Sequence, residues 1–180
     1  MTDDPHHKAR LEFLTDTAAY FSDKKSIYLE LKDEISSELG LPLSEIRICG
    51  SAYWGQSFAH DRPFRPAESD LDVALVNGTL FIKCLSEVRQ LTWNFSNLTS
   101  FRGGAGLPVM FQDYAYKKGI IRVDLMPKTR TKRSLDATSE SISRRYGKHF
   151  SKITFMVYDS EHSFTVKQIA PTAKFRGAGQ

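Results

Sequence analysis

The sequence contains few cysteines and no long apolar segment. Its two cysteines, Cys49 and Cys84, lie among apolar residues, so we interpret both as reduced core residues and not as a disulfide framework. No run approaches the ~18 apolar residues that a membrane span needs, and the residues after Met1 are polar and charged, unlike a signal peptide. We therefore expect a cytoplasmic protein that has no membrane partner.

Signatures of several common site types are also missing. Gly103, Gly104 and Gly106 lie close together, but the Lys-Ser/Thr pair of a P-loop does not follow them. We interpret residues 94–108, which are rich in Asn, Ser, Thr and Gly, as a mobile loop rather than a phosphate cradle. Nothing in the chain resembles the nucleophile elbow of a Ser-His-Asp hydrolase. The sequence therefore favours neither a P-loop protein nor a serine hydrolase.

Length and charge point to one domain with an anionic ligand. The chain has 180 residues, of which 41% are apolar, and we take residues 1–180 as a single domain with its own core. The net charge of +4 is unevenly distributed, because an acidic segment over residues 1–40 precedes a basic body. A basic body suits nucleotides or nucleic acid, although the same charge also serves solubility.

The order of the apolar patterns predicts an α/β (α+β) fold. We expect N-terminal helices within residues 1–40, a small mixed β-sheet with helices packed mainly on one face, and a flexible tail at residues 171–180. The predicted helices span residues 7–21, 25–39, 79–91 and 135–148, and the predicted strands span 45–49, a stretch ending with 73–76, 109–116, 119–126, 153–158 and 163–169.

Three carboxylates are predicted to lie on strands. Asp70 and Asp72 are two residues apart, so they point to the same side of a strand, about 7 Å from each other. Asp124 lies in an apolar run, where a carboxylate is costly to bury without a partner. Converging carboxylates persist only with cations between them, and oxygen ligands favour Mg²⁺ or Mn²⁺ over Zn²⁺. Two such ions would hold a triphosphate and activate an attacking hydroxyl.

A turn at Gly50-Ser51 supplies groups that a triphosphate also needs. Gly50 permits a close backbone approach, Ser51 offers a hydroxyl, and the start of the next helix offers free N–H groups. Structural interpretations stay open: Ser51 as a helix cap, Asp70 and Asp72 as turn residues, and Asp124 as a salt-bridge partner of Arg122 or a nearby lysine.

These motifs resemble the polymerase-β-like nucleotidyltransferase superfamily, whose pattern is Gly-Ser, a spacer, Asp-x-Asp and a third Asp. The matching segments are Gly50-Ser51, Ser69-Asp70-Leu71-Asp72-Val73 and Val123-Asp124-Leu125, within residues 25–127. The resemblance implies that Asp70 and Asp72 ligate two Mg²⁺ or Mn²⁺ ions and that Asp124 assists one ion and the acceptor hydroxyl. It also implies that Gly50, Ser51 and Ser69 bind the nucleoside triphosphate.

Two departures from the superfamily pattern affect the substrate. The spacer of residues 52–68 is longer than in the smallest members and adds a loop with His60, Arg62 and Arg65, which either reach phosphates or an acceptor or are simply solvated. We also expect no counterpart of the large C-terminal helical domain with which many members of the superfamily grip their base or acceptor. A basic segment starts with Lys128 and Arg130. It either binds the phosphates of a nucleic-acid or nucleotide acceptor or is a solvated face.

The resulting expectation is a Mg²⁺-dependent nucleotidyltransferase. It would transfer a nucleoside monophosphate from an NTP to a hydroxyl of an RNA end, a nucleotide or a protein, and release pyrophosphate. Its small size resembles the minimal nucleotidyltransferases of bacterial defence and toxin–antitoxin modules. Two alternatives stay open: a non-catalytic, antitoxin-like module that binds a nucleotide or a partner protein, and a nucleic-acid-binding protein that uses the basic segment.

Overall fold

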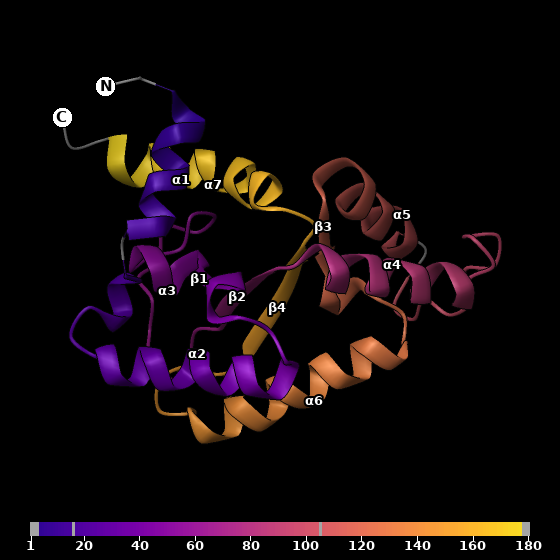
Figure 1. Cartoon of the computed structure of the whole chain (residues 1–180), viewed down its shortest axis with the longest axis horizontal. Helices are drawn as coiled ribbons and strands as arrows, with labels where there is room; N and C mark the ends of the chain where they lie inside the picture. The colour runs from indigo at the N-terminus through magenta and orange to yellow at the C-terminus, as the bar shows by residue number, and fades with distance from the viewer. Residues whose placement is uncertain (1–3, 16, 105, 178–180) are drawn as a thin grey trace.

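The computed structural model describes residues 4–15, 17–104 and 106–177, which form helices around a four-stranded sheet (Figure 1). The α-helices are α1 (Pro5–Thr15), α2 (Lys25–Leu39), α3 (Gly50–Trp54), α4 (Gly78–Leu91), α5 (Leu107–Gln112), α6 (Arg130–Arg145) and α7 (Glu161–Arg176). The strands are β1 (Ile46–Cys49), β2 (Leu71–Val76), β3 (Ile120–Arg122) and β4 (Ile153–Tyr158). Short turns complete the chain: the 3-10 turns η1 (Ala19–Phe21), η2 (Leu43–Glu45) and η4 (Val123–Leu125), and the π-helical turn η3 (Asp113–Lys117).

The sheet is open and mixed, with the strand order β1-β2-β4-β3. The central strands β2 and β4 are parallel, and each outer strand is antiparallel to its neighbour. A parallel pair needs a long crossover connection, which here contains α4, α5, β3 and α6. The prediction of an α/β protein with a small mixed sheet is therefore confirmed.

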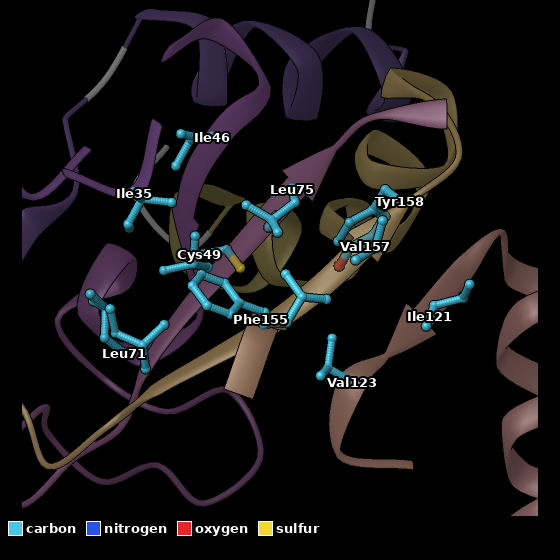
Figure 2. Packing of buried hydrophobic residues seen from close by; sticks show 14 of the residues in the cluster. Ile35, Ile46, Cys49, Leu71, Leu75, Ile121, Val123, Phe155, Val157 and Tyr158 are labelled. Atoms are coloured by element: carbon cyan, nitrogen blue, oxygen red, sulfur yellow. The ribbon is translucent and has the colours of Figure 1, made fainter. Parts of the chain in front are cut away.

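One face of the sheet is entirely apolar and forms the centre of the core (Figure 2). Because side chains alternate along each strand, the register places nine buried residues on this face. They are Ile46, Ile48, Leu71, Val73, Leu75, Ile121, Ile153, Phe155 and Val157. Helices α2 and α6 pack against β1 and β4 and against each other, so their buried stripes complete the core.

The opposite face has a packed half and a polar half. In the packed half, Tyr158 of β4 contacts Phe164 of α7, with ring centroids 5.3 Å apart, and α1 packs on α7. Towards the other end of the strands, this face carries Asp72, Thr154 and Arg122. The polar half is the part of the fold that positions the candidate site.

Helices lie on both sides of the sheet, with α2 and α6 on one side and α1 and α7 on the other (Figure 1). This differs from the predicted cover of mainly one face, because residues 163–169 form part of α7 and not a strand. Ser160 caps α7 by accepting a hydrogen bond from a backbone N–H of the first turn. The buried residues Phe164, Gln168 and Thr172 recur every four positions, which is the period of one helical face.

The prediction of a strand over residues 109–116 is also wrong, since this segment forms α5 and η3. Phe111 and Ala115 are buried four residues apart. Asp113 and Lys117 form an ion pair of 2.9 Å at the same spacing. Residues four apart lie on the same side of a helix, so both pairs form only if the segment is helical. The alternation of apolar and polar residues that predicted a strand here is too short to outweigh these contacts.

The predicted flexible tail is wrong for residues 171–176, which continue α7 beyond Pro171. Thr172 is buried, and the ring of Phe175 stacks on Trp54 with centroids 5.1 Å apart. Residues 178–180 of the predicted tail lie outside the described residues. The end of α7 therefore packs against α3, the helix that begins at the Gly-Ser turn.

The other predicted elements differ from the structure mainly at their ends. The helix over 25–39 and the strand over 153–158 have the observed bounds of α2 and β4. The helix predicted over 7–21 divides into α1 and η1, the helix predicted over 135–148 begins at Arg130, and the strand predicted over 119–126 is β3 followed by η4. Across the described ranges, no helix combines the length and apolarity needed to cross a membrane.

Candidate active site

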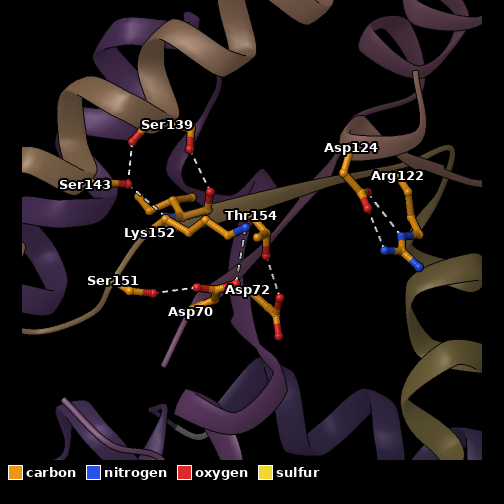
Figure 3. Close-up of polar contacts among 10 residues, drawn as sticks. Asp70, Asp72, Arg122, Asp124, Ser139, Ser143, Ser151, Lys152 and Thr154 are labelled. Atoms are coloured by element: carbon orange, nitrogen blue, oxygen red, sulfur yellow. Dashed lines mark hydrogen bonds and ion pairs between the residues drawn. The ribbon is translucent and has the colours of Figure 1, made fainter. Parts of the chain in front are cut away.

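The two carboxylates of the Asp-x-Asp motif lie at the start of β2. Asp72 is the second residue of β2 and Asp70 directly precedes the strand. Asp72 Oδ1 accepts a hydrogen bond of 2.5 Å from the Thr154 hydroxyl on β4 (Figure 3). Asp70 Oδ1 accepts one of 2.5 Å from the Ser151 hydroxyl, and its Oδ2 lies 3.5 Å from Lys152 Nζ. The start of β4 therefore supplies the groups that hold both carboxylates.

Gly50 brings the Gly-Ser turn into direct contact with Asp72. It follows β1 and has a φ of +65°, a conformation that side-chain-bearing residues rarely adopt. A Cβ atom at this position would lie 2.0 Å from Asp72 Oδ2 and 2.9 Å from its Cγ. The carboxylate thus occupies the space that any other residue at position 50 would fill. The Gly-Ser turn and the Asp-x-Asp motif, with residues 52–69 between them in the sequence, meet at this point.

The environment of Asp72 disfavours its negative charge. Burial is the main cause that raises the pKa of this carboxyl group above its usual value, and the charges of Asp70 and Asp124 raise the pKa further. The hydrogen bond from Thr154 and the positive charge of Arg122 oppose the increase in pKa without cancelling it. A bound cation would relieve this repulsion, so the electrostatics favour a cation next to Asp72.

Asp124 lies apart from the other two carboxylates. It is the middle residue of η4, and its side chain is 57% exposed. Arg122 donates two hydrogen bonds to it, from Nε to Oδ1 at 3.2 Å and from Nη2 to Oδ2 at 2.6 Å. Figure 3 shows this pair facing each other, set apart from Asp70 and Asp72. Asp124 thus pairs with Arg122 in this conformation, as one of the two open interpretations predicts.

The three carboxylates do not form one metal-binding cluster in this conformation. Within residues 4–15, 17–104 and 106–177, no group of three or more His, Cys, Asp or Glu side chains is arranged to hold a metal ion. Asp70 and Asp72, with the hydroxyls of Ser151 and Thr154, nevertheless offer an all-oxygen set of the kind that Mg²⁺ and Mn²⁺ prefer. In this conformation two of the three predicted ligands lie together, while Asp124 is held by Arg122.

Ser51 and Ser69 have different surroundings. Ser51 is the second residue of α3 and is half-buried. The Ser69 hydroxyl accepts a hydrogen bond of 3.0 Å from the Arg65 backbone N–H. The Ser69 carbonyl accepts another of 3.0 Å from the Ser151 backbone N–H. Ser69 therefore joins the spacer loop to the start of β4, next to the carboxylates.

The spacer loop, residues 52–68, packs against α7. Its two sides are linked by hydrogen bonds from Ser57 N to Arg62 O and from Phe64 N to Gly55 O, of 2.7 and 2.8 Å. Lys174 of α7 donates to the Phe58 carbonyl at 3.0 Å and forms an ion pair with Asp61. These contacts fix the loop beside the Gly-Ser turn.

The basic residues predicted on this loop are all exposed. His60 donates a long hydrogen bond of 3.3 Å from its backbone N–H to Ser57, within the loop. Arg65 lies 3.4 Å from Glu68, also within the loop. Like Arg62, both side chains face solvent. Their contact with phosphates or an acceptor stays a prediction.

The predicted basic segment begins beside Asp124. Lys128 and Arg130 are exposed residues between η4 and the first turn of α6. Lys132, further along α6, donates to the Val123 carbonyl at 2.9 Å and anchors the helix to η4. The basic segment is therefore divided between residues with a structural partner and residues that are open to a ligand.

Reasoning from the sequence missed Ser151 and Thr154 as site residues. Both became neighbours of the carboxylates because β4 pairs with β2, with Thr154 opposite Asp72. A signal was present in the sequence: polar residues stand at the start of an otherwise apolar strand, as Asp70 and Asp72 do at the start of β2. The sequence did not reveal that these two strands are adjacent.

Comparisons of the chain with models of protein families, with curated proteins and with solved structures find no match in any of the three.

Proposed function

We propose that this chain is a divalent-cation-dependent nucleotidyltransferase, which transfers a nucleoside monophosphate from an NTP to a hydroxyl and releases pyrophosphate. The observation that carries the proposal is the contact between Gly50 and the Asp72 carboxylate. It makes one site from the Gly-Ser turn and the Asp-x-Asp motif. The same two motifs carry the resemblance to the polymerase-β-like nucleotidyltransferase superfamily.

Asp70 and Asp72 would hold Mg²⁺ or Mn²⁺ in this site, because their carboxylates and the hydroxyls of Ser151 and Thr154 supply oxygen ligands. The bound ions would neutralise the triphosphate and lower the pKa of the attacking hydroxyl. Lys152 would give up Asp70 at little cost, since exposed ion pairs contribute only about 0–1 kcal/mol. Gly50, Ser51 and Ser69 would then contact the phosphates from the side of the turn.

Asp124 would join the site after it leaves Arg122. The pair is exposed, so its separation costs about 1 kcal/mol or less, which cation binding easily offsets. Arg122 lies on the same sheet face as Asp72 and would then be available to a phosphate oxygen. Asp124 would then approach one of the bound metal ions and the acceptor hydroxyl.

The acceptor is proposed to be an RNA end, a nucleotide or a hydroxyl of a partner protein. Lys128 and Arg130 are exposed next to η4, which favours an acceptor that carries phosphates. Each lysine or arginine that contacts a phosphate makes binding more sensitive to salt. A steep loss of RNA binding with salt would distinguish RNA from a protein acceptor.

The test is a transfer assay with each α-labelled NTP, Mg²⁺ or Mn²⁺, and candidate RNA, nucleotide and protein acceptors. The paired variant Asp70→Asn/Asp72→Asn should lose transfer. Asp33→Asn, which changes an exposed acid on α2, should keep it. The proposal fails if no acceptor becomes labelled, or if the paired variant labels as much as the wild type.

A second candidate is a non-catalytic module that binds a nucleotide or a partner protein. It is favoured by the pairing of Asp124 with Arg122 and of Asp70 with Lys152, since both place a cation from the protein on a predicted metal ligand. This module would show Mg²⁺-dependent thermal stabilisation by an NTP with no transfer to any acceptor. Stabilisation that persists in Asp70→Asn/Asp72→Asn would exclude the Asp-x-Asp site as the place of binding.

A further inference from the structure

A separate cavity of about 580 Å³ lies along β1, the edge strand of the sheet. Residues of α1, α2, β1 and α3 line it, together with the cap and first residue of α7, and the Asp70 and Asp72 pair is not among them. Its volume is within the range of about 300–1,000 Å³ that small-molecule sites have. This cavity plays no part in the proposed transfer reaction.

Two cationic side chains line this cavity, and Arg47 of β1 is the more buried of them. The side chain of Arg47 is only 13% exposed, and its guanidinium group lies 4.9 Å from the Phe164 ring. The nearest acid is Glu161, at the long distance of 3.8 Å from Nη2. Nη1 is buried and has no hydrogen-bond partner in the described part of the chain. An unsatisfied N–H donor costs free energy, and the poorly paired positive charge of this guanidinium group favours an anion in the cavity beside it.

Lys32 of α2 is the second cation of the cavity. Its pKa is lowered, first by burial and then by the positive charge of Arg47. The protein thus holds two cations close enough to repel each other. In the residues that the structure describes, no acid lies within ion-pair distance of the Lys32 ammonium group. The ring of Tyr28 lies beside it, with its centroid 5.5 Å from Nζ.

The two acids that also line the cavity have other partners. Glu45 accepts a hydrogen bond of 2.6 Å from the Asn77 side chain. Glu161 accepts one of 3.1 Å from Arg10 of α1. Neither acid therefore satisfies the two cations fully.

Aromatic rings form another part of the lining. Phe13 of α1 stacks on Tyr53 of α3, with ring centroids 4.0 Å apart, and both border the cavity with Tyr28. We propose that this cavity binds a small organic anion, whose phosphate or carboxylate group lies between Lys32 and Arg47 and whose flat apolar part contacts Tyr28 and Phe13. The proposal does not depend on the transfer reaction, because the two sites share no residue.

The test is isothermal titration calorimetry with four probes in EDTA, which removes any contribution of a metal at the Asp70 and Asp72 pair. Phenyl phosphate and benzoate carry both parts of the proposed ligand, with different anions. Inorganic phosphate and phenol carry one part each. At least one of the first two should bind about tenfold more tightly than either of the last two, and the better of the pair identifies the anion.

Three variants place the binding site. Lys32→Met should weaken binding of the better probe by about tenfold or more, since it removes a charged donor. Lys25→Met changes an exposed lysine on the same helix and should bind like the wild type. Asp70→Asn/Asp72→Asn should also bind like the wild type. Lys32→Gln serves as a second variant if Lys32→Met does not fold, as monitored by thermal unfolding.

Several results would overturn the proposal. They are the absence of binding by both phenyl phosphate and benzoate, unchanged binding in the folded Lys32 variant, and loss of binding in Asp70→Asn/Asp72→Asn. Inorganic phosphate that binds as tightly as phenyl phosphate would refute the aromatic part. None of these results depends on the transfer assay, so the two proposals can fail separately.

Discussion

The start of β2 and the turn after β3 each present an aspartate of the same sequence pattern, but in opposite surroundings. Asp72 is half-buried, contacts Gly50 and accepts a hydrogen bond from Thr154 on a neighbouring strand. Asp124 is mostly exposed and binds Arg122, two residues away on its own segment. Asp72 therefore links three segments that are distant in the sequence, whereas Asp124 is held only locally. The difference predicts that substitutions at the start of β2 affect folding far more than those after β3.

Gly50→Ala should have the largest effect. The new Cβ would meet Asp72 Oδ2, and alanine is strained at a φ of +65°. Strain of ~1–2 kcal/mol and overpacking of ~1–3 kcal/mol together predict a loss of about 3 kcal/mol in the free energy of unfolding. Urea unfolding measures the loss.

Gly40→Ala is the matched control for this substitution. Gly40 also has a φ of +65°, but a Cβ atom there would have no neighbour within 4 Å. The control should lose only the ~1–2 kcal/mol of backbone strain. Equal losses for the two variants would show that the contact between Gly50 and Asp72 has no energetic role. In the Asp72→Ala background, Gly50→Ala should cost less than in the wild type.

Thr154→Val should have the next largest effect. It removes the hydroxyl that donates to Asp72 and leaves a half-buried carboxylate without that partner. Hydrogen bonds to charged groups contribute about 1.5–3 kcal/mol, so we expect a loss of about 2 kcal/mol in urea unfolding. Thr154→Ser keeps the hydroxyl and should lose much less. A loss in Thr154→Val no larger than that in Thr154→Ser would show that the hydrogen bond to Asp72 has little energetic role.

Asp72→Asn should stabilise the protein at neutral pH, by up to about 1 kcal/mol, because it removes a charge that burial disfavours. The pKa of Asp72 is raised in the folded state, so the folded protein binds this proton more tightly than the unfolded chain. Wild-type stability should therefore fall as the pH rises through the unfolded and then the folded pKa of this carboxyl group. The advantage of Asp72→Asn should disappear at acid pH. Unfolding curves at several pH values would contradict this account if the variant were less stable at neutral pH.

The fold was predictable from the sequence where apolar residues are also the buried ones. The buried stripe of α2, with Leu31 and Ile35, and the buried face of β4 meet this condition. The bounds of both elements agree with the prediction. In α7 the condition fails, because Gln168 is buried while Val166 is 47% exposed. A pattern read from apolarity alone then gives the wrong period. Contacts with α1 and the sheet decide the structure of this segment.

The site was predictable only in its local parts. The Gly-Ser and Asp-x-Asp motifs can be read from the sequence, and the structure brings Gly50 and Asp72 into contact. The partnership of Thr154 with Asp72 depends on the strand order, which short apolar runs do not encode. The pairing of Asp124 with Arg122 was one of two open interpretations, because the sequence does not show whether a neighbouring arginine or a metal ion partners the carboxylate.

Asp124→Asn should have the smallest effect on stability, and it makes the sharpest test of the comparison. Exposed ion pairs contribute about 0–1 kcal/mol, so the variant should unfold within about 1 kcal/mol of the wild type. Asp136→Asn, which removes an exposed acid that pairs with Lys132 on α6, is the control and should behave alike. If Asp124 serves the proposed transfer, Asp124→Asn should nevertheless reduce labelling of the acceptor by about tenfold or more, while Asp136→Asn should not. A stability loss as large as that of Thr154→Val would show that Asp124 is a structural residue like Asp72, and the contrast between the two regions would be wrong.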